Sequence, residues 1–411
     1  MSKVRSNTKD SHAASQRHFA AWLALFAAIG FFPLRAPCAA QGDYKVQQIA
    51  PHTFVWVPED IMDQNGDPDF NRAVNVGFVI TDQGVVVIDT ANNPFHAREI
   101  LYEIRQRTGL PVRLVINLGP QADQVLGNEV FAEQHAVIVS TSAAEAQMQS
   151  YQLSLGHRMS FDPELPVRMR GIHFTLPTQT FTGETTFHLG SEEIRVVSMN
   201  CGPPGKNSGD AVVYLPQDKT LFLGDLYVNG YVPQVGSRDI TRWITALGKL
   251  EKWNADVFVP GHGEPGPQKD LAAFQGFLGW LKAGVQGGIQ QGESLSQVER
   301  RLLSSSAFNL RALDLAPHAI RQVYEQLKGA STAHAAPSGA NSSPAVSGDH
   351  RISVPSARRF VKLTGVCPSC KPGAAAAKNR SDHRFHVTPH SARPSQAPLQ
   401  LPRKRFAVHR A

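Results

Sequence analysis

A run of polar side chains follows a short apolar segment, and it is the first place in the chain where chemistry is expected. Residues 114–116 are apolar and predict a strand, a Gly-Pro pair at 119–120 marks a loop, and a helix is expected to begin near Val125. The polar residues between strand and helix are Gln121, Asp123 and Gln124. In α/β proteins, binding and catalytic groups usually lie just beyond the end of a buried strand.

The surrounding elements would hold this stretch in place. An opening strand is expected over residues 44–58, followed by strands over 75–80, 85–90 and 114–117, a hairpin turn at 82–84 and a helix over 95–107. Residues 266–329 have a helical pattern and are expected to close the domain. Strands alternating with helices predict a sheet covered by helices, which is an α/β fold.

Four landmarks in this order resemble the metallo-β-lactamase superfamily. They are the hairpin at 75–90, the stretch at 115–128, the segments at 193–226, and Pro-Gly-His-Gly at 260–263, spread over roughly residues 44–265. The resemblance implies a four-layer αββα sandwich over residues 41–329. It also implies that metal ions, usually two zinc ions, bind between the two sheets.

The family's His-x-His-x-Asp-His motif is altered here. Gly119 and Gln121 stand at the first two histidines, Asp123 is retained, and Gln124 stands at the third. In the loop at 204–210, Lys206 stands where the family has the histidine of Gly-His-Thr-x-Gly-Asp.

The resemblance therefore implies one damaged metal site and one that is mostly intact. The first site would need Gly119, Gln121 and Lys206, and none of them is a good zinc ligand, because glycine has no side chain and a lysine ammonium has no lone pair. The second site keeps Asp123, Asp225 and His262. Two carboxylates and one imidazole could hold one divalent ion, and Mn, Mg or Fe would suit oxygen donors as well as zinc does.

A metal-free centre is the competing interpretation. If Asp123 and Asp225 lie about 4 Å apart, they repel by roughly 4 kcal/mol at an effective dielectric constant near 20. The hypothesis is that the Lys206 ammonium replaces the ion, and that Lys206→Ala would lower the melting temperature of the metal-free protein.

Each of these residues also has a purely structural interpretation. Asp225 and His262 could be hydrogen-bonding groups of a packed loop, and Asp123 could cap the helix that follows it. Asp89 ends its strand and is interpreted as an orienting group. Four further histidines are interpreted as ordinary surface or strand residues: His135, His157, His173 and His188.

The two ends of the chain differ from its body in composition. Lys and Arg residues precede an apolar run at 19–32 and small residues up to Ala40, so residues 1–40 are predicted to be a cleavable signal peptide, and the protein is expected to be exported to the periplasm or secreted. An uncleaved anchor is the alternative. Few cysteines would remain, so stability is expected to come from an apolar core.

The charge is unevenly distributed along the chain. Residues 41–334 hold 23 Lys and Arg against 31 Asp and Glu, a balance of −8, whereas residues 335–411 hold 13 against 2, a balance of +11. Residues 330–348 are predicted to be a disordered linker and residues 349–411 a basic, disordered tail. The tail could contact an anionic surface, but it carries no specific nucleic-acid motif. Cys367 and Cys370 have the spacing of a redox motif or of half a zinc site, which is only a weak signal, and a local disulfide after export or no role is expected instead.

Two functions follow from this sequence. The first is an exported, non-catalytic or impaired homologue that binds a small molecule in the former cleft, lined by Gln121, Gln124, Lys206 and Asn207, with no metal. The alternative is a hydrolase of esters, thioesters or amides that uses one metal ion on Asp123, Asp225 and His262, with Asp123 as the catalytic group. Whether the protein is an enzyme is left open, and the fold alone does not identify a substrate.

Overall fold

The computed structural model describes residues 44–59 and 62–335. The predicted signal peptide, the basic tail, most of the linker and Cys38, Cys367 and Cys370 lie outside these residues. Across the described ranges, no helix has the length and apolar character needed to cross a membrane.

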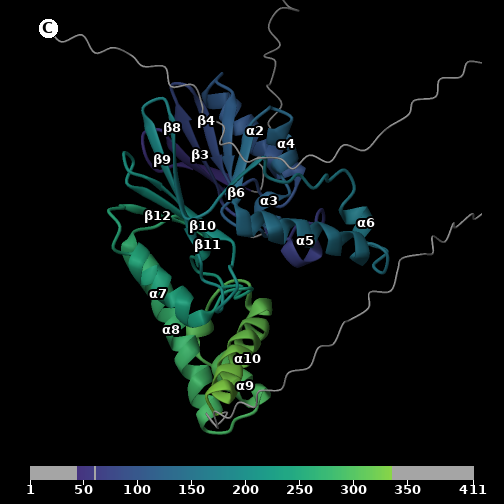
Figure 1. The fold of residues 1–411 in the computed structure, drawn as a ribbon, viewed down its shortest axis with the longest axis vertical. Coiled ribbons are helices and arrows are strands. Elements are labelled where there is room, and N and C mark those ends of the chain that lie inside the picture. Colours follow the sequence, from purple (N-terminus) through teal and green to yellow (C-terminus); the bar gives the residue numbers. More distant parts are fainter. Residues whose placement is uncertain (1–43, 60–61, 336–411) are drawn as a thin grey trace, which may run out of the picture. The chain divides into compact units, whose positions relative to one another are not determined.

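Two β-sheets form the centre of the domain (Figure 1). The first has seven strands that lie in sequence order: β1 (Tyr44–Gln48), β2 (Thr53–Pro58), β3 (Val76–Thr81), β4 (Gly84–Ile88), β5 (Val112–Ile116), β6 (Val137–Thr141) and β7 (Gln179–Phe181). Neighbouring strands are antiparallel up to β4 and parallel from β4 onwards.

The second sheet has five strands in the order β12-β11-β10-β9-β8. They are β8 (Glu184–Leu189), β9 (Glu192–Met199), β10 (Asp210–Leu215), β11 (Thr220–Val228) and β12 (Val257–His262). The strands pair antiparallel except for β11 and β12, which run parallel and therefore end on the same side of the sheet.

Helices connect the strands and follow the second sheet. The α-helices are α2 (Pro94–Arg107), α3 (Ala122–Val125), α4 (Asn128–Ala132), α5 (Ser142–Arg158), α6 (Leu165–Arg168), α7 (Ile240–Leu250), α8 (Gln268–Gln290), α9 (Leu295–Leu303) and α10 (Ala316–Ala335). Short 3₁₀ turns are η1 (Pro68–Phe70), η2 (Ser306–Phe308) and η3 (Leu313–Leu315).

Strand β4 shows why four layers form. Its side chains alternate between the two faces of the first sheet, as in any strand. Val86 and Ile88 pack between the two sheets, while Val85 and Val87 pack against α2 and α4 on the other face, and all four are buried. On the far side, the second sheet packs against α7, α8 and α10. The order of layers is helix, sheet, sheet, helix, so the predicted αββα sandwich is confirmed (Figure 1).

Most expected elements are present with small changes in their bounds. The opening strand over 44–58 is in fact two paired strands, β1 and β2. The helix over 95–107 is α2, which begins one residue earlier at Pro94 after the cap residue Asn93. Helix α10 continues to Ala335, so the linker predicted from residue 330 begins at least six residues too early.

Candidate functional site

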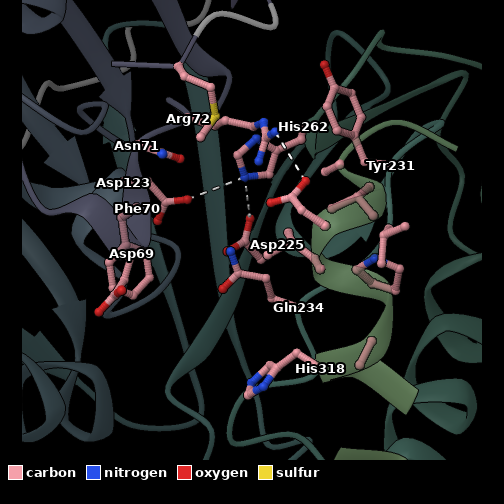
Figure 2. Close-up of a pocket in the computed structure, with 18 of the residues that line it drawn as sticks. Asp69, Phe70, Asn71, Arg72, Asp123, Asp225, Tyr231, Gln234, His262 and His318 are labelled. Carbon is pink, nitrogen blue, oxygen red and sulfur yellow. Dashed lines mark hydrogen bonds and ion pairs between the residues drawn. The ribbon is translucent and has the colours of Figure 1, made fainter. Parts of the chain in front are cut away.

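Three elements deliver Asp123, Asp225 and His262 to one point. Asp123 lies in the first turn of α3, Asp225 lies within β11, and His262 is the last residue of β12. The pairing of β11 with β12 is irregular around Gly224, which has a φ of 51°. Such a bulge re-aims the neighbouring side chain, and Figure 2 shows Asp225 directed at the His262 ring.

The three side chains form a compact cluster. His262 Nε2 lies 3.3 Å from Asp123 Oδ2 and 3.7 Å from Asp225 Oδ1. One potential ligand atom from each residue lies within 4.8 Å of the other two. The exposed fractions of these side chains are 3% for Asp123, 11% for Asp225 and 16% for His262, so the cluster is largely shielded from bulk water.

Asp89 and Asn75 hold the segments on either side of the cluster. Asp89 Oδ1 accepts a hydrogen bond of 2.8 Å from the backbone N–H of Leu118, at the start of the loop that leads to Asp123. This contact agrees with the orienting role predicted for Asp89. The Asn75 side chain donates to the carbonyl oxygens of Pro260 and Gly263, at 2.9 and 2.7 Å, and so fixes the turn that carries His262.

The carboxylates and the imidazole perturb one another. Burial and the charge of Asp123 raise the pKa of Asp225 to about 6, although His262 and Arg238 act in the opposite direction. Burial lowers the pKa of His262, but its hydrogen bond to Asp123 and the charges of Asp225 and Asp123 outweigh burial and raise it above its usual value. The centre therefore has an excess of negative charge that favours a bound cation or proton.

The donor set fits one metal ion. Oδ1 of Asp123 and Oδ1 of Asp225 are buried, and neither has a hydrogen-bond partner among the described residues. Buried carboxylate oxygens are normally paired with a donor or a cation. Two carboxylates and one imidazole are a common ligand set, with room left for water. Asp123, Asp225 and His262 are thus the residues that would hold an ion.

The family's other metal site does not fit. Gly119 has no side chain, and the space that a Cβ atom would occupy there is filled by Oε1 of Gln124 and Oε1 of Gln121, at 2.2 and 2.5 Å from that position. The side-chain amides of Gln121 and Gln124 thus fill the space beside Gly119, but an amide oxygen is a weaker zinc ligand than an imidazole nitrogen.

The structure does not support the cation hypothesis for Lys206. Lys206 and Asn207 are exposed, and no ion pair between Lys206 and either aspartate occurs in the described part of the chain. The buried cation that acts on Asp225 is instead Arg238, which pairs with Asp210 at 2.6 Å. The cap interpretation of Asp123 is also wrong, because the N-cap position of α3 is Gln121.

A cavity of about 500 Å³ opens above the cluster. Its walls come from the loop around η1, the loop after β11, and the segment from η3 into α10 (Figure 2). The lining residues are Met62, Pro68, Asp69, Phe70, Asn71, Arg72, Asp123, Asp225, Val228, Tyr231, Val232, Pro233, Gln234, His262, Ala312, Asp314, Leu315, His318 and Ala319. Gln121, Gln124, Lys206 and Asn207, which were expected to line the cleft, are absent from this set.

Sequence reasoning missed most of the cavity wall. Tyr231, Gln234, Leu315 and His318 lie in loops or helices between or beyond the family landmarks, where no motif identifies them. The four other histidines are exposed, as their interpretation as ordinary surface residues required. His173, for example, pairs with Glu129 far from the cluster's three ligands.

Comparison with known proteins shows which family residues 70–262 resemble. Residues 70–262 match the family model of the metallo-beta-lactamase superfamily. The linear primary-alkylsulfatase of a Pseudomonas species is 21% identical over 215 residues, which cover 44% of this chain and 40% of the relative. The metallo-beta-lactamase type 2 of Elizabethkingia meningoseptica is 23% identical over 259 residues, which cover 61% of this chain and 90% of the relative.

A solved structure gives a similar comparison. The metallo-beta-lactamase from Pontibacter korlensis is 22% identical, with a TM-score of 0.44 over 57% of this chain and 98% of that structure. The chain thus spans less than half the length of the alkylsulfatase and nearly the whole length of the two lactamases. The matched range ends at His262, so the cavity wall formed by residues 312–319 lies beyond it. Residues 70–262 therefore carry the features of the metallo-β-lactamase superfamily.

Proposed function

We propose that the protein is a hydrolase of esters, thioesters or amides that uses a single divalent metal ion. The observation that carries this proposal is the cluster itself. Its three ligand atoms lie within 4.8 Å of one another, and each of its two carboxylates has a buried oxygen without a hydrogen-bond partner among the described residues. Three protein ligands with an open position are typical of catalytic rather than structural metal sites.

The bound ion would lower the pKa of water and polarise a carbonyl group. Two carboxylates make the donor set oxygen-rich, so Mn, Mg and Fe compete with zinc here. The loss of the first-site histidines leaves no second ion to assist, and we therefore expect an impaired rate relative to two-metal members of the family.

The residues of this chain divide the remaining work. Asp123 offers one oxygen to hold the ion, and its other oxygen could accept a proton from the attacking water. The water oxygen adds to the acyl carbon, the bond from that carbon to the leaving group breaks, and the leaving group takes up the proton that Asp123 accepted. The apolar cavity walls exclude bulk water and orient the acyl group.

A metal-free ligand-binding protein is the second candidate. His262 Nε2 lies within 4 Å of both carboxylates, so the imidazole can partly neutralise them without an ion. In that case the cavity would bind a small molecule without turning it over.

We also propose that the protein is exported and that its basic tail contacts an anionic surface.

Calorimetric titration of the chelator-treated full chain with Mn²⁺, Mg²⁺ and Zn²⁺ separates the two candidates. The hydrolase proposal expects about one equivalent of ion to bind. A ligand contributes on the order of a few kcal/mol, so Asp225→Ala should weaken binding roughly a hundredfold or more. Lys206→Ala is the matched control and should bind like the wild type.

Hydrolysis of p-nitrophenyl esters is measured on the same samples. Activity that appears with the ion and is lost in Asp225→Ala supports the hydrolase. If the wild type binds no ion and shows no metal-dependent hydrolysis, the hydrolase proposal is wrong, and the metal-free ligand-binding protein remains as the candidate.

A further inference from the structure

We infer that the segment from Ala312 to Ala319 selects substrates that carry an apolar chain beside the reacting acyl group. This inference deepens the proposed function and rests on it for the reaction, but the binding preference can be tested without catalysis. The segment lies beyond residues 70–262, the range matched by the family model.

The cavity is polar at its base, and nine of the sixteen residues along its walls are apolar. The base holds Asp123, Asp225 and His262, whereas the walls carry apolar side chains from all three wall segments. These apolar side chains are Met62, Pro68, Phe70, Val228, Val232, Pro233, Ala312, Leu315 and Ala319. Met62 is 46% exposed although it is apolar. A ligand with an apolar body would cover such surface and gain free energy from its removal from water.

The C-terminal wall is fixed in position before any ligand arrives. The backbone N–H of Val232 donates to the Arg311 carbonyl at 3.0 Å, and the N–H of Arg311 donates to the Gly230 carbonyl at 2.9 Å. Arg311 Nη1 also donates to the Tyr231 hydroxyl at 2.9 Å and lies over the same ring. The loop after β11 and the start of the C-terminal wall therefore form one joined surface.

The backbone conformation of Ala312 is a second observation that points to a binding role for this wall. Ala312 adopts a left-handed φ of 57°, which is unusual for a residue other than glycine. Residues held in this region cluster at binding sites, where the surrounding structure forces the conformation. Small side chains at Ala312 and Ala319 also leave the space that an apolar chain would fill.

The opposite wall is anchored as well. Asp67, just before η1, accepts hydrogen bonds from Arg158 at 2.7 and 2.9 Å and from the Tyr151 hydroxyl. Arg72 from this wall lies 3.5 Å from Asp314 of the C-terminal wall. An apolar chain bound between these two anchored walls would contact apolar side chains on both of them.

The test changes the wall by one residue and uses its neighbour as a control. Leu315 is half-buried and lines the cavity, whereas Leu313, in the same 3₁₀ turn, is 52% exposed and does not. The metal-loaded full chain and its Leu315→Trp and Leu313→Trp variants are assayed with p-nitrophenyl acetate and p-nitrophenyl octanoate. We expect the wild type to prefer the octanoate in kcat/KM.

Leu315→Trp should lower kcat/KM for the octanoate by about tenfold or more, because filling an apolar pocket discriminates on this scale. It should lower kcat/KM for the acetate much less than for the octanoate, and Leu313→Trp should resemble the wild type. A wild type without chain-length preference, or equal effects of the two tryptophans, would overturn the inference. Ala319→Leu is a second variant that should act in the same direction.

A binding assay keeps this inference separate from the proposed function. Displacement of the dye anilinonaphthalene sulfonate by hexanol and by ethanol is measured on the wild type, Asp225→Ala and Leu315→Trp. The inference expects hexanol to displace the dye more strongly from the first two and to lose this advantage in Leu315→Trp. If no ester is hydrolysed but this pattern holds, only the proposed reaction fails. If hexanol shows no advantage over ethanol, the inference fails.

Discussion

At the scale of single residues, Asp89 shows how a buried carboxyl group can matter without touching a ligand. It is 1% exposed, has a left-handed φ of 61° and accepts the Leu118 N–H. Burial raises the pKa of Asp89 well above its usual value, although the Leu118 N–H opposes this, and the charges of Asp225 and Asp123 raise it further. The hydrogen bond, rather than the charge, is what the loop to Asp123 requires.

Asp89→Asn and Asp89→Ala should therefore behave differently. The asparagine carbonyl can still accept from Leu118, so we expect its free energy of unfolding to stay within about 1 kcal/mol of the wild type. The alanine leaves the Leu118 N–H buried and unpaired, which costs about 1–3 kcal/mol. Urea denaturation measures both. Equal losses in the two variants would contradict the argument.

Arg238, rather than Lys206, is the buried positive charge that acts on Asp225. It makes a two-bond pair with Asp210 at 2.6 and 3.1 Å, and both side chains are almost fully buried. Its Nη1 also donates to the carbonyl of Gln234, which lines the cavity. Arg238 thus connects the interior of the domain to the cavity wall.

Arg238→Met should destabilise the protein strongly, because it leaves Asp210 as a buried charge without its partner. Breaking such a pair costs about 3–5 kcal/mol. Arg242→Met and Lys206→Ala change exposed cations and should stay within about 0.5 kcal/mol of the wild type. Chemical denaturation compares the three. A large loss for Lys206→Ala and none for Arg238→Met would restore the original Lys206 hypothesis.

The residues of the cluster could be found from the sequence, but their surroundings could not. Asp123, Asp225 and His262 stand in recognisable motifs, and the structure brings them together. Arg238 and Leu315 carry no motif, because their roles depend on which distant segments fold against them. The prediction that the Lys206 ammonium lies at the metal centre was wrong for a related reason. Its place in the motif gives its position in the loop but not the direction of its side chain.

At the scale of elements, the loop around η1 depends on a few polar anchors. Asp67 is buried and binds Arg158 and Tyr151 of α5, and Gly66 exchanges backbone and side-chain hydrogen bonds with Arg168 of α6. The loop has little regular structure of its own, so these bonds determine where Phe70 and Arg72 stand at the cavity.

Asp67→Asn should loosen this loop in a pH-dependent way. Burial acts to raise the pKa of Asp67, but hydrogen bonds from Arg158, Tyr151 and the Asp69 N–H outweigh it, and the pKa lies below its usual value of 3.8. A lowered folded-state pKa gives stability that is present above pH 3.8 and is lost as the pH falls through the folded-state value.

We expect Asp67→Asn to lose about 1.5–3 kcal/mol of unfolding free energy at neutral pH, as hydrogen bonds to charged groups contribute. The difference from the wild type should shrink below about pH 4, where the aspartate is protonated in the unfolded state. Denaturation across this range measures it. A difference that grows towards acid pH would show that the assigned pairing is wrong.

Element types were predictable where a pattern repeats. The apolar strands and α2 follow period-2 and period-3.6 patterns, and their bounds agree with the structure within a few residues. Helix α3 has only four residues, too few for a period, and the contact between its first turn and β12 is made across more than 130 residues of chain. Such contacts are set by the packing of whole layers.

At the scale of the whole molecule, the described residues complete their own apolar core. The clusters between the sheets and on both outer faces use residues up to Leu327, and α10 ends at Ala335. The balance of −8 over residues 41–334 and of +11 over residues 335–411 places the positive charge beyond this core. Because α10 passes residue 330, a truncation meant to spare the fold has to end after residue 335.

A chain ending at residue 339 should therefore keep its melting temperature and metal affinity but lose retention on heparin at low salt. The basic segment supplies the attraction to a polyanion, and this attraction weakens as salt rises. A matched full-length variant with Gln in place of Lys and Arg from residue 351 onwards should elute like the truncated chain. Retention of the truncated chain equal to that of the wild type would place the polyanion contact on the acidic body instead. A lowered melting temperature would show that residues beyond 339 support the core.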